Sequence, residues 1–292
     1  MGRLHFLIAT ALGLFGAASA NAECAPEFAQ PAQTVTLNAI EVGSGKTVRE
    51  NFNVRVQNDE TGPCEAVIRV VKTNGFLNGS HNFILESGPQ VIQVLSNISA
   101  AGGGASDLQV SGIGNSSVGR SVPITITMPT EWGLTSGTTT EEYSLLLFDQ
   151  RATLLDTMTL YVRFEVFPAV ELRIVGVTGA SEIAQMDLGI LEPDRLNMSD
   201  PFALRVWSTS GYSVAFESQN LGVLRHRSQT DRIPYMMLMN GNEVDLRGAI
   251  TTYFSQPSDA MGNLHPLQIN VLPFEARSGE YSDRVTVTVS AS

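Results

Sequence analysis

Apolar and polar residues alternate one by one along much of this chain. A period of two places successive side chains on opposite faces of an extended strand, so the pattern predicts half-buried, antiparallel β-strands. In the longest example, at 158–166, the polar residues Thr159, Arg163 and Glu165 separate the apolar positions. Shorter stretches with the same pattern lie at 52–56, 122–128, 170–174, 202–206, 212–216, 267–271 and 285–289.

The order of these stretches predicts the fold class. No segment has a convincing helical periodicity, and Gly, Asn and Pro separate the short strands, which favours β-sandwiches over an architecture of alternating strands and helices. The segment FNVRV at 52–56 is echoed by FALRV at 202–206, and both halves finish on a long alternating strand. We therefore predict an all-β protein with two immunoglobulin-like β-sandwich domains in tandem.

A proline marks the predicted boundary between the two domains. The alternating strand that ends at Val166 is followed by Phe167-Pro168-Ala169, and a new strand begins at once. Proline cannot donate a ladder hydrogen bond and therefore interrupts strands. We expect residues 23–167 to form an N-terminal β-sandwich and residues 168–292 to form a C-terminal one.

The first 22 residues predict a signal peptide. Arg3 supplies a positive charge, residues 6–15 are apolar, and Ala20-Asn21-Ala22 matches a signal-peptidase site. The apolar run is about ten residues long, whereas a membrane span needs about 18. We therefore expect cleavage before Glu23, export, and no insertion into the membrane.

Export places the two cysteines, Cys24 and Cys64, in an oxidising compartment. Their even number predicts one disulfide between the mature N-terminus and a strand about forty residues further on. Closing such a loop stabilises a fold by about 4 kcal/mol in the chain-entropy model. A catalytic or metal-binding thiol would need a histidine or a further cysteine nearby in the sequence, and neither is present.

Charge and motifs weigh against several classes of function. The chain has 29 acidic and 18 basic residues, a net charge of −11 that disfavours nucleic acids and anionic membrane surfaces as partners. Its mature histidines, at 81, 226 and 265, lack metal-binding spacing, and no nucleophile elbow or nucleotide-binding loop occurs. We therefore expect no enzyme, no metal and no cofactor. A glycosidase pair drawn from Glu141, Glu142 and Asp149 is the remaining alternative.

Four motifs in the C-terminal half share their order and spacing with a known family. They are MDLGILEP at 186–193, SGYSV at 210–214 leading to LGVLRH at 221–226, IPY at 233–235 followed by NG at 240–241 and VDL at 244–246, and GEYSDRVTVTV at 279–289. On these motifs, residues 170–292 resemble the spore coat protein U-like family, which includes pilin domains of archaic chaperone/usher pili. Leu188 stands where that family usually has Phe, and Ala291 lacks the aromatic side chain often found in classical pilins.

The resemblance implies an incomplete sandwich in the C-terminal domain. Its missing strand would be lent first by a periplasmic chaperone and then by a neighbouring pilus subunit, with assembly at an outer-membrane usher. An extended donor segment pairs with an open sheet edge and seats alternate side chains in an apolar groove. The residues expected at this edge are Tyr281, Val285, Val287 and Val289.

The resemblance also indicates which kind of pilus subunit this protein is. A pilin donates an N-terminal extension of alternating apolar residues, whereas this mature chain leads from Glu23 straight into a cysteine-tethered module. We therefore expect a tip adhesin, exported through the periplasm to the cell surface, that attaches to a host or abiotic surface or supports biofilm formation. The alternatives are a structural envelope or coat protein without a specific ligand, and a periplasmic pilus-assembly chaperone. The chaperone clefts are typically basic, whereas only Arg163 and Arg173 lie near this boundary.

Two loops of the N-terminal domain supply candidate contact residues. Phe76 and Leu77 lie at a predicted turn, and Trp132 and Leu134 lie in a loop between strands. Exposed aromatic residues on loops suggest contact with a sugar or an apolar surface. The alternative is that these side chains cap the ends of the sandwich core. Trp207, taken in phase with the apolar residues of 202–206, is expected in the core.

Overall fold

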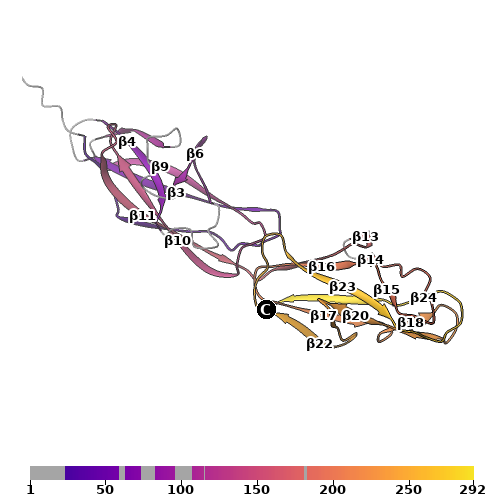
Figure 1. Ribbon diagram of the computed structural model, residues 1–292. Helices are drawn as coiled ribbons and strands as arrows, with labels where there is room; N and C mark the ends of the chain where they lie inside the picture. Colours follow the sequence, from indigo (N-terminus) through magenta and orange to yellow (C-terminus); the bar gives the residue numbers. More distant parts are fainter. Residues whose placement is uncertain (1–23, 59–62, 74–82, 96–106, 115, 181–182) are drawn as a thin grey trace, which may run out of the picture.

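Two lobes lie end to end and give the molecule an elongated shape (Figure 1). The structure is a computed structural model that describes residues 24–58, 63–73, 83–95, 107–114, 116–180 and 183–292. All secondary-structure elements in these ranges are β-strands, so the predicted all-β class is confirmed. The same ranges contain no helix with the length and apolarity needed to cross a membrane. The predicted signal peptide lies outside the described residues.

The first lobe, residues 24–166, is a sandwich of two sheets. One sheet has the spatial order β1-β3-β9-β5-β6, and the other has the order β2-β11-β10-β4-β7 with β8 also paired to β4. Pairing is antiparallel except that β2 runs parallel to β11 and β7 runs parallel to β4. The bounds are β1 Pro26–Phe28, β2 Ala32–Thr36, β3 Thr47–Asn58, β4 Cys64–Lys72, β5 Ile84–Ser87, β6 Gln90–Ile92, β7 Val94–Leu95, β8 Leu108–Ile113, β9 Ser116–Pro129, β10 Gly137–Phe148 and β11 Leu154–Val166.

The alternating pattern fills the core of the first lobe from both sheets. On β11, Met158, Leu160 and Val162 are at most 1% exposed, while the residues between them face outward. Val54 of β3 and Ile124 of β9 meet them from the opposite sheet within one continuous apolar cluster. Burying an aliphatic side chain of this size stabilises a fold by roughly 1.5–3 kcal/mol. The strands predicted in this half are therefore confirmed together with their buried faces.

The second lobe, residues 170–292, contains more and shorter strands. Its largest sheet has the order β12-β16-β23-β20-β21, with β15 also paired to β23, and two three-stranded sheets have the orders β22-β17-β25 and β19-β18-β24. A separate hairpin joins β13 and β14. The bounds are β12 Val170–Val175, β13 Thr178–Ala180, β14 Ile183–Gln185, β15 Asn197–Met198, β16 Phe202–Ser208, β17 Tyr212–Ser218, β18 Val223–His226, β19 Arg232–Pro234, β20 Met236–Met239, β21 Asn242–Glu243, β22 Arg247–Phe254, β23 Asn263–Val271, β24 Tyr281–Ser282 and β25 Val285–Ala291.

The core of the second lobe lies between its large sheet and the β22-β17-β25 sheet. Leu204 and Val206 from β16 and Val214 from β17 are almost completely buried in one cluster. The prediction that Trp207 joins this core is wrong. The core positions of β16 are even-numbered, so the odd-numbered Trp207 points to the opposite face, where it is half-buried beside Arg173 and Arg205.

The junction between the lobes is built around Thr209, which is fully buried. Its hydroxyl donates to the carbonyl of Phe167 (3.0 Å) and accepts the N–H of Ala169 (2.8 Å). Its carbonyl accepts the N–H of Ser136 from the first lobe (2.6 Å). The apolar cluster of the first lobe ends at Val166, on one side of these contacts, and that of the second lobe lies beyond them. The predicted domain division at 167/168 stays a prediction.

Candidate functional site

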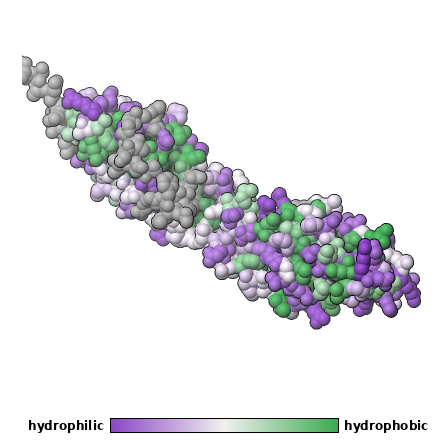
Figure 2. Space-filling view, in the orientation of Figure 1, coloured by the Kyte–Doolittle hydropathy of each residue, from purple (hydrophilic) through white to green (hydrophobic). Residues whose placement is uncertain are grey.

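A groove of about 1010 Å³ opens into the core of the second lobe. Phe202 from the large sheet and Phe216 from the β22-β17-β25 sheet lie on its floor. Ile174 on β12 lines one side, and Val285 and Val287 on β25 line another. Apolar residues are visible at the surface of this lobe among polar ones (Figure 2). The two sheets therefore enclose a core that stays open to one side.

The strand β25 forms one rim of the groove. It pairs with β17 from Tyr212↔Ala291 to Ser218↔Val285, and among the described residues no strand pairs with its other edge. Its valines are half-buried against the core while the Thr and Ser residues between them are exposed. On the other rim, β12 pairs only with β16 in the part of the chain that is described. The groove thus lies between two sheet edges whose backbone groups can pair with an added strand.

The structure brings together three of the four residues predicted at this edge. Tyr281, Val285 and Val287 line the groove, and Val289 packs on the same core beyond the lining. The Tyr281 hydroxyl donates to the carbonyl of Arg277 (2.8 Å), and its ring meets His226 edge to face. Desolvation raises the pKa of Tyr281, with a smaller contribution from Asp231. Whether these residues bind a partner stays a prediction.

The segment 186–193, noted in the sequence for its Gly and Pro turn, forms a wall of the groove. Met186, Leu188 and Leu191 are half-buried against the core, whereas Ile190 is 96% exposed. This segment forms no strand. Two sequence motifs separated by about ninety residues, at 186–193 and 279–289, therefore meet at one groove.

A polar corner closes the end of the groove where the chain passes from β24 to β25. The Asp283 carboxylate accepts hydrogen bonds from the hydroxyls of Ser218 and Tyr235, the second at 2.6 Å. It also accepts the backbone N–H groups of Asn220 (3.1 Å) and Arg284 (2.8 Å). Burial raises the pKa of Tyr235, and the neighbouring Asp283 raises it further. Asp283 is not among the residues predicted at this edge, although it lies inside the GEYSDRVTVTV motif.

Of the four candidate surface contacts of the first lobe, the structure describes two, Trp132 and Leu134. Phe76 and Leu77 lie outside the described residues. Trp132 and Leu134 are half-buried, pack on the core of the first lobe and lie at the junction, where the neighbouring Gly133 approaches Ala260 of the second lobe. A side chain at Gly43 would collide with the Trp132 ring, since its Cβ would be 2.8 Å from that ring. Trp132 therefore covers the junction end of the core, and its contact with a ligand stays a prediction.

The predicted disulfide between Cys24 and Cys64 is confirmed. It ties the segment just before β1 to the first residue of β4, with the two Cα atoms 5.7 Å apart. β1 also pairs with β3 over Pro26–Phe28. The first described residues are therefore held to the first lobe by a covalent bond and by a strand.

The carboxylates considered for a glycosidase pair are separated by the structure. Glu141 is buried, pairs with Lys72 (3.0 Å) and accepts the hydroxyl of Tyr143, whereas Glu142 lies on the opposite face of the same strand. Burial raises the pKa of Tyr143, and Glu141 raises it further. Asp149 follows the far end of β10, roughly 25 Å along the strand from Glu141 at about 3.3 Å per residue. These three groups cannot flank one bond.

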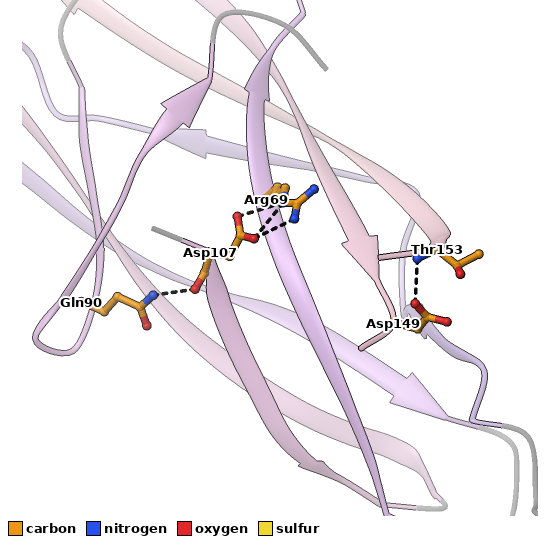
Figure 3. A network of polar contacts seen from close by, with 5 residues as sticks. All are labelled: Arg69, Gln90, Asp107, Asp149 and Thr153. Carbon is orange, nitrogen blue, oxygen red and sulfur yellow. Dashed lines mark hydrogen bonds and ion pairs between the residues drawn. The ribbon is translucent and has the colours of Figure 1, made fainter. Parts of the chain in front are cut away.

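The polar network of the first lobe has a structural role (Figure 3). Arg69, 5% exposed, binds the Asp107 carboxylate through Nε and Nη2 at 2.9 Å, and Gln90 donates to the Asp107 carbonyl at 2.7 Å. These bonds fasten the start of β8 to β4. The Thr153 and Arg151 N–H groups bind Asp149 and lower its pKa. Within the described ranges, no three His, Cys, Asp or Glu residues gather in a way that could hold a metal ion.

Neither a family model nor a curated protein matches this sequence. Among solved structures, the chain is similar to CfaE, the adhesive subunit of CFA/I fimbria of enterotoxigenic Escherichia coli, at 11% identity and a TM-score of 0.42, covering 87% of this chain and 77% of that one. It is similar to the CsuC–CsuE chaperone–tip adhesion subunit complex from archaic Csu pili of Acinetobacter baumannii at 12% identity and a TM-score of 0.38, covering 91% and 99%.

A third similar structure is the YadV chaperone, at 10% identity and a TM-score of 0.26, covering 90% of this chain and all of that one (100%). Similarities at this level establish neither a shared family nor a shared activity. The resemblance to the spore coat protein U-like family stays a prediction, and the function has to be inferred from the groove.

Proposed function

We propose that this chain is an exported adhesive subunit of a chaperone/usher pilus, with a C-terminal domain that accepts a strand from a partner protein. The groove beside the unpaired edge of β25 carries this proposal. A donor strand on that edge would pair with the backbone of β25 and cover the half-buried Val285 and Val287. The donor would come from a periplasmic chaperone and then from a neighbouring subunit, at an outer-membrane usher.

The way the first lobe holds Cys24 and β1 supports the role of a tip subunit. From Cys24 onward the N-terminal segment is fixed by the disulfide and by β1, so this segment is not free to be donated. Such a subunit accepts a strand through its second lobe and presents its first lobe outward. We propose that the first lobe binds the host or abiotic surface, with Phe76, Leu77, Trp132 and Leu134 as its candidate contacts.

The test uses the mature chain, residues 23–292, and a synthetic peptide that alternates Val, Ile or Leu with Thr or Ser. The peptide has about ten residues, the upper end of the usual strand lengths. We expect the peptide to raise the melting temperature of the second lobe and to protect the backbone amides of β25 from hydrogen exchange. The control is a peptide of the same composition with its apolar residues grouped in one block.

Two neighbouring substitutions make the test specific. Val287 lines the groove and Thr288 points outward from the same strand. Val287→Lys should abolish the effect of the alternating peptide, whereas Thr288→Lys should leave it intact. The proposal is wrong if the two peptides have equal effects on the melting temperature and amide exchange. It is also wrong if the two substitutions change the effect of the alternating peptide equally. If no peptide changes the stability or the amide exchange of the second lobe, the alternative of a structural envelope protein is favoured. If the wild-type chain captures unfolded pilus subunits, the alternative of an assembly chaperone is favoured.

A further inference from the structure

Asp283 lies where the chain changes sheets. Residues Tyr281–Ser282 pair with β18, and from Val285 onward the chain pairs with β17 instead. Asp283 and Arg284 form the step between these two pairings, and Asp283 also lines the groove. The position and direction of β25 therefore depend on how this step is held.

The carboxylate of Asp283 holds this step to two other parts of the lobe. Ser218 is the last residue of β17, and Tyr235 immediately precedes β20; both are buried, and both donate to the same carboxylate oxygen. Hydrogen bonds to a charged acceptor are about twice as strong as those between neutral groups. One side chain thus joins the start of β25 to the end of its partner strand and to the opposite side of the core.

The same carboxylate also fixes the turn after β17. The N–H of Asn220 donates to Asp283, and the next residue, Leu221, has a left-handed backbone conformation with φ of 60°. That conformation is unfavourable for a residue with a branched side chain and persists where the surroundings enforce it. The N–H of Gln219 further donates to the carbonyl of Arg284 at 2.8 Å. Hydrogen bonds therefore connect the turn after β17 directly to the two residues that lead into β25.

We propose that Asp283 is a positioning residue of the groove, which holds the edge of β25 ready to pair with a donor strand. The proposal rests on the proposed function, since it names the residue that prepares the same site. Edge strands that are half-buried and paired on one side open locally at low free-energy cost. The apparent affinity of a donor that needs a formed edge is its intrinsic affinity multiplied by the fraction of molecules in which the edge is formed.

The experiment compares Asp283→Asn with Asp259→Asn in the mature chain. Asp259 is a matched control because its carboxylate also binds a local N–H, that of Met261 at 2.9 Å, but it lies outside the groove. For Asp283→Asn we expect the alternating peptide to bind more weakly, by up to about tenfold, the usual size of one lost charged hydrogen bond. We also expect faster amide exchange in β25 but not in β22. Asp259→Asn should change neither.

A second variant serves if Asp283→Asn fails to fold. Tyr235→Phe retains the ring that lines the groove and removes one hydroxyl donor to the Asp283 carboxylate. By the same measure, it should weaken binding of the peptide by up to about tenfold, with the same local loss of protection. Unchanged peptide binding in both folded variants, or exchange that rises equally in β22 and β25, would overturn the role of Asp283. If the wild-type chain fails to bind the peptide, the proposed function fails, while the exchange measurement still decides whether Asp283 holds β25.

Discussion

The two lobes are both built from alternating strands, yet the strands β11 and β25 are covered to different extents. In the first lobe, β10 pairs with β11 from Gly137↔Val166 to Phe148↔Leu154, and a second sheet covers the apolar face of β11. In the second lobe, β25 has the same alternation, but its valines are only half-buried and one of its edges pairs with no described strand. Alternation thus specifies which face of a strand is apolar, and the neighbouring strands decide how completely that face is covered.

The first lobe also has the disulfide cross-link. The disulfide between Cys24 and Cys64 and the buried pair of Arg69 with Asp107 both lie in the first lobe. The second lobe has instead a groove, with the exposed Ile190 beside it and a polar corner at Asp283. These two stabilising contacts belong to the first lobe, and a molecule that binds only the folded second lobe at its groove would stabilise that lobe.

Removing the disulfide should have the largest effect. For Cys24→Ser with Cys64→Ser, we expect the free energy of unfolding of the first lobe to fall by about 4 kcal/mol, because the loop between residues 24 and 64 is no longer closed in the unfolded state. Amide exchange measured separately in the two lobes should show unchanged protection in the second lobe. An equal loss of amide protection in both lobes would mean that they unfold as one unit. The two lobes would then not differ in stability.

Truncating one core side chain in each lobe compares closed with open packing directly. Leu145 on β10 is fully buried, whereas Val287 on β25 is half-buried. Leu145→Ala should cost about 3 kcal/mol, the usual cost of a cavity in a closed core, and Val287→Ala about 1 kcal/mol. Urea unfolding with a probe in each lobe measures both values. Comparable costs would indicate that β25 is as well covered as the strands of the first lobe.

Acid should destabilise the second lobe through His265. This side chain is 6% exposed and bonds to the Tyr212 hydroxyl (2.7 Å), and desolvation lowers its pKa below the ordinary value of 6.5. Above pH 6.5 the imidazole is neutral in both states and contributes no pH dependence. As the pH falls below 6.5 toward the folded pKa, the unfolded state binds a proton that the folded state excludes, so stability decreases.

The measurement is urea unfolding of the second lobe between pH 7.5 and pH 5. His265→Gln should remove this part of the pH dependence, although it lowers stability at neutral pH. His226 is the control, because its ring is half-buried and its Nδ1 accepts two backbone N–H groups, from Ser228 and Gln229. If His226→Gln flattens the profile and His265→Gln does not, the assignment to His265 is wrong.

Asp149→Asn should have the smallest effect. The Thr153 and Arg151 N–H groups stabilise the charged carboxylate in an exposed turn and lower its pKa. The contribution is present above the ordinary pKa of 3.8 and is lost as the pH falls through the lower folded value. At neutral pH we expect a slight drop in the melting temperature of the first lobe, within the range of surface substitutions. A drop as large as that of Leu145→Ala would contradict this.

Much of the fold follows from local pattern, and Trp207 shows where the phase of that pattern matters. The strands at 158–166 and 285–289 were predictable because a period of two is a local property of the chain. The misplacement of Trp207 came from grouping it with Phe202 and Leu204, although an odd spacing puts it on the other face of β16. The disulfide was predictable because only two cysteines are present.

The sequence by itself determined the all-β class, the apolar faces of the main strands and the disulfide, because each depends on neighbouring residues or on a count. Only the tertiary structure decided that the segments 186–193 and 279–289 meet at one groove and that Trp132 covers the junction end of the core. It also decided that the Asp283 carboxylate accepts hydrogen bonds from the hydroxyls of Ser218 and Tyr235. These contacts join residues far apart in the chain, and their partners are set by the register and packing of sheets, which no local period encodes.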